Sequence, residues 1–213
     1  LETMVGHLRE VWPRLEQESE WQSQREFERV SAMIERFDVW DKANMRSLVA
    51  AEFPIDVLLD EADESVKLRG SVDRLEQHHG SDALQVVDFK TGSLVPSKEK
   101  AASHAQLGFY QVAIERGAAK DLVHNGAPLG EAPPGGAELV HLACEKGTRD
   151  PLLPKVSQQE ALSEESPALG QIRHAVEVIR SENHPAIPCD SCRYCEFKRI
   201  CPTTSEPTIG EQL

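Results

Sequence analysis

The sequence contains no run of apolar residues close to the ~20 that a membrane-spanning helix needs, so we expect no membrane-spanning segment. The opening residues, LETMVGHLRE, also lack the basic segment and apolar stretch of a secretion signal. They lack an initiator methionine and fall within a predicted helix, so we expect the chain to be a fragment of a longer protein. Together these absences favour a cytoplasmic location.

Basic residues are outnumbered: 23 Lys and Arg face 36 Asp and Glu, which gives a formal net charge of −13 over 213 residues. Proteins that bind nucleic acid usually carry a basic surface, because they neutralise phosphates. Composition alone therefore argues against a nucleic-acid partner, although the same charge is typical of a soluble cytosolic protein. The length allows one sizeable core, or one core with a small appendage.

Hydrophobic periodicity predicts helices first and strands afterwards. The predicted elements are helices over 3–50, strands over 52–59, 66–76 and 83–90, a helix over 101–118, strands over 137–144 and 152–158, and a helix over 166–182. Short connections make the first three strands an antiparallel meander, and the Gly- and Pro-rich stretch 125–136 is predicted to be a flexible loop. This order predicts an α/β fold, with one sheet covered by helices on both faces.

The stretch VVDFKTG, residues 86–92, places an acid and a base two positions apart in a predicted strand. Side chains at i and i+2 share a face of a strand, so Asp88 and Lys90 should lie side by side while Val87 and Phe89 face the other way. An exposed ion pair is the simplest explanation of such a tripeptide. The surrounding sequence offers a second explanation.

Two further carboxylates belong to the neighbouring strands of the meander. Strand pairing can bring Asp73 close to Asp88, and Glu52 stands at the start of the strand before. Such a cluster beside Lys90 is costly unless a hard cation such as Mg²⁺ or Mn²⁺ neutralises it. That metal would activate water for phosphodiester hydrolysis, and the lysine would orient the water or neutralise the developing charge. A solvated Glu52 and a surface pair of Asp73 with Arg74 remain alternatives.

The motifs GSVDR, VDFKTG and QLGFY, in this order, resemble the RecB-type nucleases of the PD-(D/E)XK superfamily. The resemblance implies a restriction-endonuclease-like core with a central mixed sheet, over 51–182, preceded by N-terminal helices over 1–50 and followed by a Cys-rich metal-binding tail over 183–213. The residue roles that it implies are metal ligation by Asp73, Asp88 and Glu52, and a catalytic set of Lys90 with Gln106 and Tyr110. Because the superfamily includes domains that have lost catalysis, a non-catalytic DNA-binding or structural module is the alternative.

One histidine of the family pattern has no clear counterpart. The family usually places a metal-binding His on an upstream helix, in a G-x-x-x-H context. His7 lies in MVGHLREVW, whose other residues resemble the segment after that helix, so we expect the true ligand to precede Leu1. The other histidines without a partner pattern are interpreted as loop or surface residues: His78, His79, His104, His141 and His174.

Four of the five cysteines crowd into CDSCRYCEFKRIC, with the spacing C-x2-C-x2-C-x5-C: Cys189, Cys192, Cys195 and Cys201. Thiolates at this spacing bind zinc or an iron–sulfur cluster, and unligated or oxidised thiols are the third reading. The last three also resemble the C-x2-C-x5-C of AddB-type nucleases, which implies a 4Fe-4S cluster. Its fourth ligand is then Cys189 or a residue upstream of the chain. Cys144, on a predicted strand, is expected to be buried.

The resemblance spans residues 50–202 and looks most like the C-terminal nuclease domain of actinobacterial UvrD/Rep-type helicases. It implies an exonuclease-type deoxyribonuclease in DNA repair and recombination, with DNA and a fused or separate helicase motor as partners. A positive strip is predicted from the locally basic residues: Lys90, Lys98, Lys100, Arg193, Lys198 and Arg199. An electron-transfer protein is a third hypothesis, but it leaves the carboxylates and lysine without a purpose.

Overall fold

The chain divides into two units in the computed structural model, Leu1–Gln171 and Ile172–Leu213. The structure describes residues 1–15, 19–61, 64–182 and 186–203. Both ends of the predicted cysteine tail, 183–185 and 204–213, therefore lie outside the described residues. So do residues 16–18 of the predicted helical segment and residues 62–63 of the turn after the first strand.

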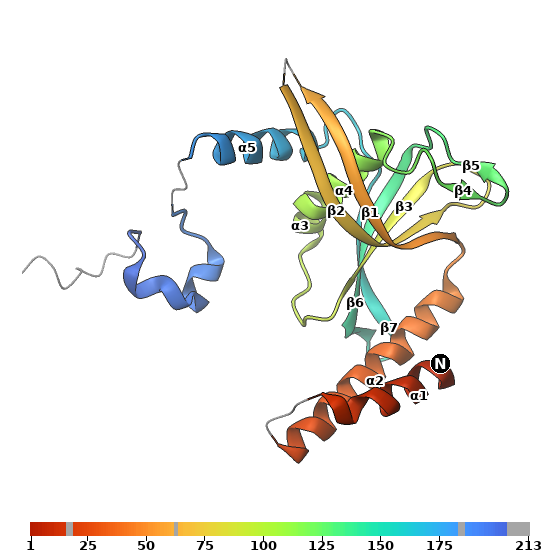
Figure 1. Ribbon diagram of the computed structural model, residues 1–213. Coiled ribbons are helices and arrows are strands. Elements are labelled where there is room, and N and C mark those ends of the chain that lie inside the picture. The colour runs from red at the N-terminus through yellow and green to blue at the C-terminus, as the bar shows by residue number, and fades with distance from the viewer. Residues whose placement is uncertain (16–18, 62–63, 183–185, 204–213) are drawn as a thin grey trace, which may run out of the picture. The chain divides into compact units, whose positions relative to one another are not determined.

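The first unit is built on a mixed five-stranded sheet of order β1-β2-β3-β6-β7 (Figure 1). Its strands are β1 (Ser47–Glu61), β2 (Glu64–Gln77), β3 (Leu84–Lys90), β6 (Pro134–Gly147) and β7 (Asp150–Gln159). The first three strands form the predicted antiparallel meander, β6 runs parallel to β3, and β7 is antiparallel to β6. The stretch predicted to be a flexible loop instead contains β5 (Ala127–Pro128), which pairs with β4 (Val123–His124), and the start of β6.

Helices flank the sheet, as predicted. In the first unit they are α1 (Glu2–Val11), α2 (Glu20–Ala43), α3 (Lys98–Ala102) and α4 (Ala105–Glu115), with a 3-10 turn η1 (Trp12–Arg14). Helix α5 (Ala168–Arg180) runs across the boundary between the units, and the 3-10 turns η2 (Asp190–Tyr194) and η3 (Glu196–Ile200) belong to the second unit. Helix α2 contacts β6 and β7, and α4 contacts β1, β3 and β6.

Two predicted helix boundaries differ from the structure. Helix α2 ends at Ala43, and residues 47–50 belong to β1, where they pair with the end of β2. An apolar run as short as residues 47–50 is compatible with both helical and strand periodicity, and its pairing with β2 makes it a strand. The predicted helix 101–118 is broken between α3 and α4, where Gln159 Nε2 donates to the carbonyls of Ala102 (3.0 Å) and His104 (3.2 Å). The Gln159 side chain of β7 thus bonds carbonyl oxygens that a continuous helix would have bonded internally.

An aromatic cluster fixes one face of β3. Val87 and Val140 pack with Trp40 of α2, and Phe89 joins them. The Phe89 ring is edge-on to both Trp40 and Phe37, with centroid distances of 5.4 Å in each case. The prediction that Val87 and Phe89 face away from Asp88 and Lys90 is confirmed.

A buried ionic network ties the start of β1 to the middle of the sheet. Arg46 bonds the buried carboxylates of Glu76, at 2.7 Å, and Glu138. Glu76 also accepts from Asn44 Nδ2 at 2.6 Å and from Arg74. Burial raises the pKa of Glu138, and Arg46 opposes that rise. The arginine therefore compensates two carboxylates that could not otherwise be buried together.

Replacing Arg46 should consequently destabilise the fold. We expect Arg46→Ala to lower the free energy of unfolding by about 3–5 kcal/mol, because it leaves buried charge uncompensated. Urea denaturation measures the loss. The matched control is Lys42→Ala, which removes an exposed lysine paired with Asp38 and should have little effect. Equally small losses in both variants would contradict a structural role for the network.

Candidate active site

The acid and base of VVDFKTG lie at the end of β3 and face α4. Asp88 is buried, and Lys90 is about one-third exposed, at 34%. Their side chains form an ion pair in which Lys90 Nζ lies 2.6 Å from Asp88 Oδ2. The simplest explanation of the tripeptide, an exposed ion pair, therefore does not hold. Burial of Asp88 adds a desolvation cost that Lys90 only partly offsets.

Gln106, in the first turn of α4, joins the site residues into one group. Its Nε2 donates to Asp88 Oδ1 (2.8 Å) and to the Tyr110 hydroxyl (2.9 Å), while its Oε1 accepts from Lys90 Nζ (2.9 Å). Gln106 and Tyr110 are four residues apart and so share one helix face. With both ends of its amide bonded, Gln106 holds the acid and the base in fixed positions.

Asp73, on β2, lies beside Asp88. The pairing of Arg74 with Val87 sets the register, and the backbone N–H of Phe89 donates to Asp73 Oδ2 at 2.7 Å. Burial is the main cause that raises the pKa of Asp88, and the negative charge of Asp73 raises it further. The Lys90 ammonium opposes both effects. The site is therefore short of positive charge.

The predicted ligand Glu52 is not brought to this cluster, and neither is His7, which was not expected to be a ligand. Among the described residues, no group of three or more His, Cys, Asp and Glu side chains is placed to hold a metal, so Glu52 does not complete a three-carboxylate site with Asp73 and Asp88. Glu52 is exposed on β1, with a left-handed backbone (φ 49°). His7 is exposed on α1, with its Nδ1 3.8 Å from Glu10.

The donor chemistry of the cluster still suits a divalent cation. Asp88 Oδ2 is buried, and Lys90 Nζ lies 2.6 Å from it. Asp73 keeps its second carboxylate oxygen for other contacts. Carboxylate oxygens are the ligands that Mg²⁺ and Mn²⁺ prefer. Two neighbouring carboxylates with too little positive charge beside them therefore fit such an ion.

Two histidines beside the site are missed by the sequence motifs. His141, on β6, is buried with 1% exposure, and its Nε2 lies 3.0 Å from Ser157 Oγ. His104 precedes α4 and is half-buried. Burial, and then the charge of Lys90, lower the pKa of both rings. The interpretation of these histidines as loop or surface residues is therefore wrong for His141. Its place within the predicted strand 137–144 could have indicated that it is buried.

The cysteines of the second unit are only partly assembled. Cys189 Sγ and Cys192 Sγ are 3.9 Å apart, and Cys201 Sγ lies 3.1 Å from Thr203 Oγ1. A hydrogen bond from the Ser191 backbone, and then one from Cys192, lower the pKa of the Cys189 thiol. Among the described residues, which include Cys195, no three thiols lie close enough together to hold a metal. Cys144, in the first unit, is half-buried and donates toward the Ser93 carbonyl.

Comparison with known proteins gives a family match over most of the chain. A family model of the PD-(D/E)XK nuclease superfamily matches residues 1–202. No curated protein matches. A solved structure titled "Crystal structure of SSO0001" is 16% identical, covers 86% of this chain and 70% of that chain, and has a TM-score of 0.43. Within the described residues, no helix is long and apolar enough to cross a membrane.

The raised pKa of Asp88 predicts that this carboxylate costs stability at neutral pH when no metal is present. Asp88→Asn should then raise the melting temperature by a few degrees, because the neutral amide removes the desolvation cost. The gain should shrink as the pH falls through the raised pKa, since protonation then neutralises the wild type as well.

Thermal unfolding with and without Mn²⁺ checks both parts of this prediction. Mn²⁺ should raise the melting temperature of the wild type by mass action and leave that of Asp88→Asn unchanged. The control, Asp82→Asn, changes an exposed carboxylate before β3 and should behave as the wild type. A lower melting temperature for metal-free Asp88→Asn would show that the ion pair outweighs the burial cost.

Proposed function

Since the chain belongs to the PD-(D/E)XK nuclease superfamily, we propose that it is a metal-dependent nuclease domain that hydrolyses phosphodiester bonds of DNA. The observation that carries this proposal is the bonded group of Asp88, Lys90 and Gln106 beside Asp73. A purely structural ion pair has no need of a second carboxylate, whose charge adds to the burial that raises the pKa of Asp88.

Each residue has a role that follows from its contacts. Asp88 and Asp73 would hold Mg²⁺ or Mn²⁺, which when bound supplies Lewis-acid activation of water and of the phosphate. Lys90 can turn its ammonium from Asp88 toward the substrate and stabilise charge on the phosphate oxygens. Gln106 and Tyr110 are positioning residues that fix the directions of the acid and the base. Glu52 would join the site only after movement of β1.

The wider setting rests on the motifs. GSVDR, VDFKTG and QLGFY support a RecB-type exonuclease domain, attached to or paired with a helicase motor in cytoplasmic DNA repair and recombination. In that setting an upstream histidine would complete the metal site. The alternative, a non-catalytic DNA-binding module, is favoured by one observation: Lys90 Nζ occupies the position beside Asp88 Oδ2 that a cation would need.

Cleavage assays on the full-length protein distinguish the two readings. Asp88→Ala should abolish Mg²⁺- or Mn²⁺-dependent cleavage of labelled DNA and leave any helicase ATPase intact. Lys90→Ala should retain metal binding, measured by calorimetry, but lower kcat about 100- to 1,000-fold, since it removes only electrostatic stabilisation. Asp82→Ala is the matched carboxylate control. Cleavage by Asp88→Ala at the wild-type rate would contradict the site assignment.

We also propose that the four clustered cysteines ligate a 4Fe-4S cluster, with zinc as the alternative. The support is their spacing, the proximity of Cys189 and Cys192, and the lowered pKa of the Cys189 thiol, which favours the thiolate that metals bind. The side chains of Tyr194, Phe197 and Ile200 between the cysteines are exposed, so ligation would supply order that packing does not.

Protein purified without oxygen should accordingly be brown and contain iron and inorganic sulfide. Cys195→Ser or Cys201→Ser should remove the colour, while Cys144→Ser, outside the cluster, should keep it. Colour that survives Cys189→Ser would place the fourth ligand upstream of Leu1, and colour lost in it would make the four-cysteine site self-contained. Stoichiometric zinc without iron in anaerobic protein would overturn the cluster and leave the nuclease proposal standing.

A further inference from the structure

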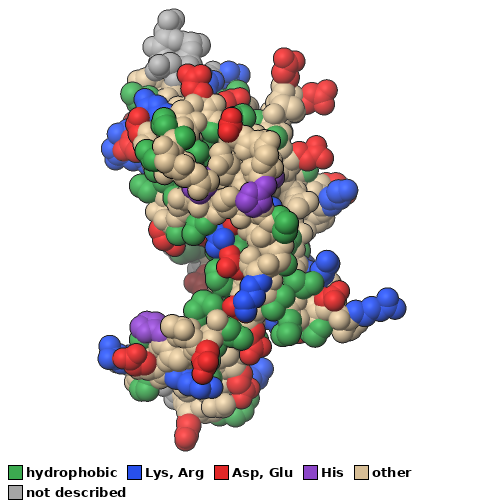
Figure 2. All heavy atoms as spheres, turned by 90° about the vertical axis from the view of Figure 1, so that its right-hand side faces the viewer, with side chains coloured by type: hydrophobic (Ala, Val, Ile, Leu, Met, Phe, Trp, Pro, Cys, Tyr) green, Lys and Arg blue, Asp and Glu red, His purple; other side chains and the backbone are tan. Residues whose placement is uncertain are grey.

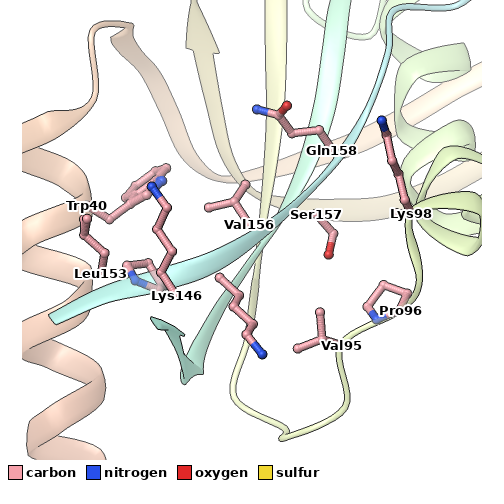
Figure 3. A pocket seen from close by; sticks show the side chains of 12 residues that line it. Trp40, Val95, Pro96, Lys98, Lys146, Leu153, Val156, Ser157 and Gln158 are labelled. Carbon is pink, nitrogen blue, oxygen red and sulfur yellow. The ribbon is translucent and has the colours of Figure 1, made fainter. Parts of the chain in front are cut away.

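A groove of about 570 Å³ follows β7, the last strand at one edge of the sheet. The continuous segment 153–158 of β7 lines it. Figure 3 shows β7 crossing the groove, with Trp40 of α2 on one side and Pro96, from the loop after β3, on the other. Successive residues of a strand face opposite ways. A groove that touches six consecutive residues therefore lies along the outer edge of the strand, and not over one face of the sheet.

The outer edge of this segment carries open backbone groups. Strand β7 pairs with β6 on its inner side, and among the described residues no backbone group outside β6 bonds to the backbone of 153–158. The two ends of β7 are occupied: Arg36 Nε donates to the Pro151 carbonyl at 3.2 Å, and the Gln159 side chain bonds the end of α3. Pro154 has no N–H, which an edge strand tolerates. The open part of the edge is therefore 155–158.

An open strand edge presents N–H donors and C=O acceptors together, and this mixture selects its ligand. An extended peptide offers the same two kinds of group along its own edge, so it can pair with both by adding a strand to the sheet. A DNA backbone offers phosphate acceptors and no donors. It would therefore leave the carbonyls of the β7 edge without partners. The edge suits a polypeptide better than a nucleic acid.

The charge of the groove is opposite to that of the whole chain. The chain carries a net charge of −13, and on the face shown in Figure 2 acidic and basic side chains are interspersed. The described residues that line the groove include no acid and three lysines, Lys98, Lys146 and Lys155. Neither Lys146 nor Lys155 pairs with a carboxylate within the described part of the chain. An acidic partner is thus attracted, whereas a second copy of β7 would bring like charges together.

The strand register predicts what a bound peptide meets on each of its faces. Val156 pairs with Val140, which packs against Trp40, so Val156 lies on the α2 face of the sheet. Its side chain is 40% exposed and leaves apolar surface open at the groove. Lys155 and Ser157 lie on the opposite face. A peptide in which apolar and acidic residues alternate would therefore place its apolar side chains beside Val156 and its acidic side chains beside Lys155.

We propose that the edge of β7 binds an extended, acidic segment of a partner protein, which extends the five-stranded sheet by one strand beside 155–158. Backbone pairing supplies the attachment, and the alternation of apolar and acidic side chains supplies the specificity. The proposal does not rest on the nuclease function, because none of the proposed site residues at the end of β3 lines the groove. The bound segment would hold a partner beside the domain and leave the Asp88 cluster accessible.

Amide hydrogen exchange and peptide binding test the proposal together. The probe is a fluorescent eight-residue peptide of alternating Glu and Val, titrated with the full-length protein, and anisotropy gives the affinity. Bound peptide should slow the exchange of outward-facing N–H groups within 155–158 about tenfold or more, because ladder hydrogen bonds replace bonds to water. The same peptide with every internal amide N-methylated keeps its charge but has no internal N–H donors. It should not bind.

Charge reversal tests the acidic character of the partner. Lys146→Glu combined with Lys155→Glu should weaken peptide binding about tenfold or more, since each reversal replaces attraction by repulsion. The control Lys120→Glu changes an exposed lysine after α4, outside the groove, and should keep the wild-type affinity.

Four results would overturn the proposal. They are equal binding of the N-methylated peptide, unchanged exchange within 155–158, wild-type affinity in the double variant, and absence of binding by the wild type. Slower exchange of the same amides with a 12-nucleotide DNA strand, and not with the peptide, would assign the groove to nucleic acid and overturn the proposal as well. DNA cleavage by the protein is judged separately, because every step of this test is carried out without metal or catalysis.

Discussion

Phe89 packs edge-on against Trp40 and Phe37 of α2. This contact determines which residues of β3 face the opposite side of the strand. Successive residues of a strand face opposite ways, so fixing Val87 and Phe89 against α2 turns Asp88 and Lys90 toward α4. Gln106 then needs only one amide group to bond the acid, the base and Tyr110. A small apolar cluster on one face thus positions a polar site on the other.

The electrostatics of that site are unbalanced. Burial and the neighbouring Asp73 both oppose the charge of Asp88, and a single lysine answers them. The buried network of Arg46 with Glu76 and Glu138 is different, because each carboxylate there has an arginine partner. The first arrangement would gain from a bound cation, and the second would not. Within one sheet, the compensated network of Arg46 is thus a structural group, and the uncompensated cluster of Asp88 is the candidate for catalysis.

The sequence predicted the parts of this arrangement that depend on local spacing. Alternation placed Asp88 and Lys90 on one face, short turns implied the meander, and the four-residue spacing put Gln106 and Tyr110 on one side of a helix. It did not predict what depends on pairing between distant segments. The burial of His141 arises because β3 and β7 lie on either side of its strand. The exposed position and left-handed backbone of Glu52 cannot be predicted from the residue pattern around it.

An acidic protein can act on nucleic acid if a bound cation offsets the negative charge of the carboxylates at its site. The central claim is that Asp73 and Asp88 bind that cation. Its most direct test is a crystal structure of the full-length protein soaked in Mn²⁺, with anomalous scattering locating the metal. We predict a peak within coordination distance, about 2.0–2.2 Å for such an ion, of Asp88 Oδ2 and of an Asp73 oxygen, with Lys90 displaced from Asp88. No peak there, with Lys90 still paired to Asp88, would contradict the account.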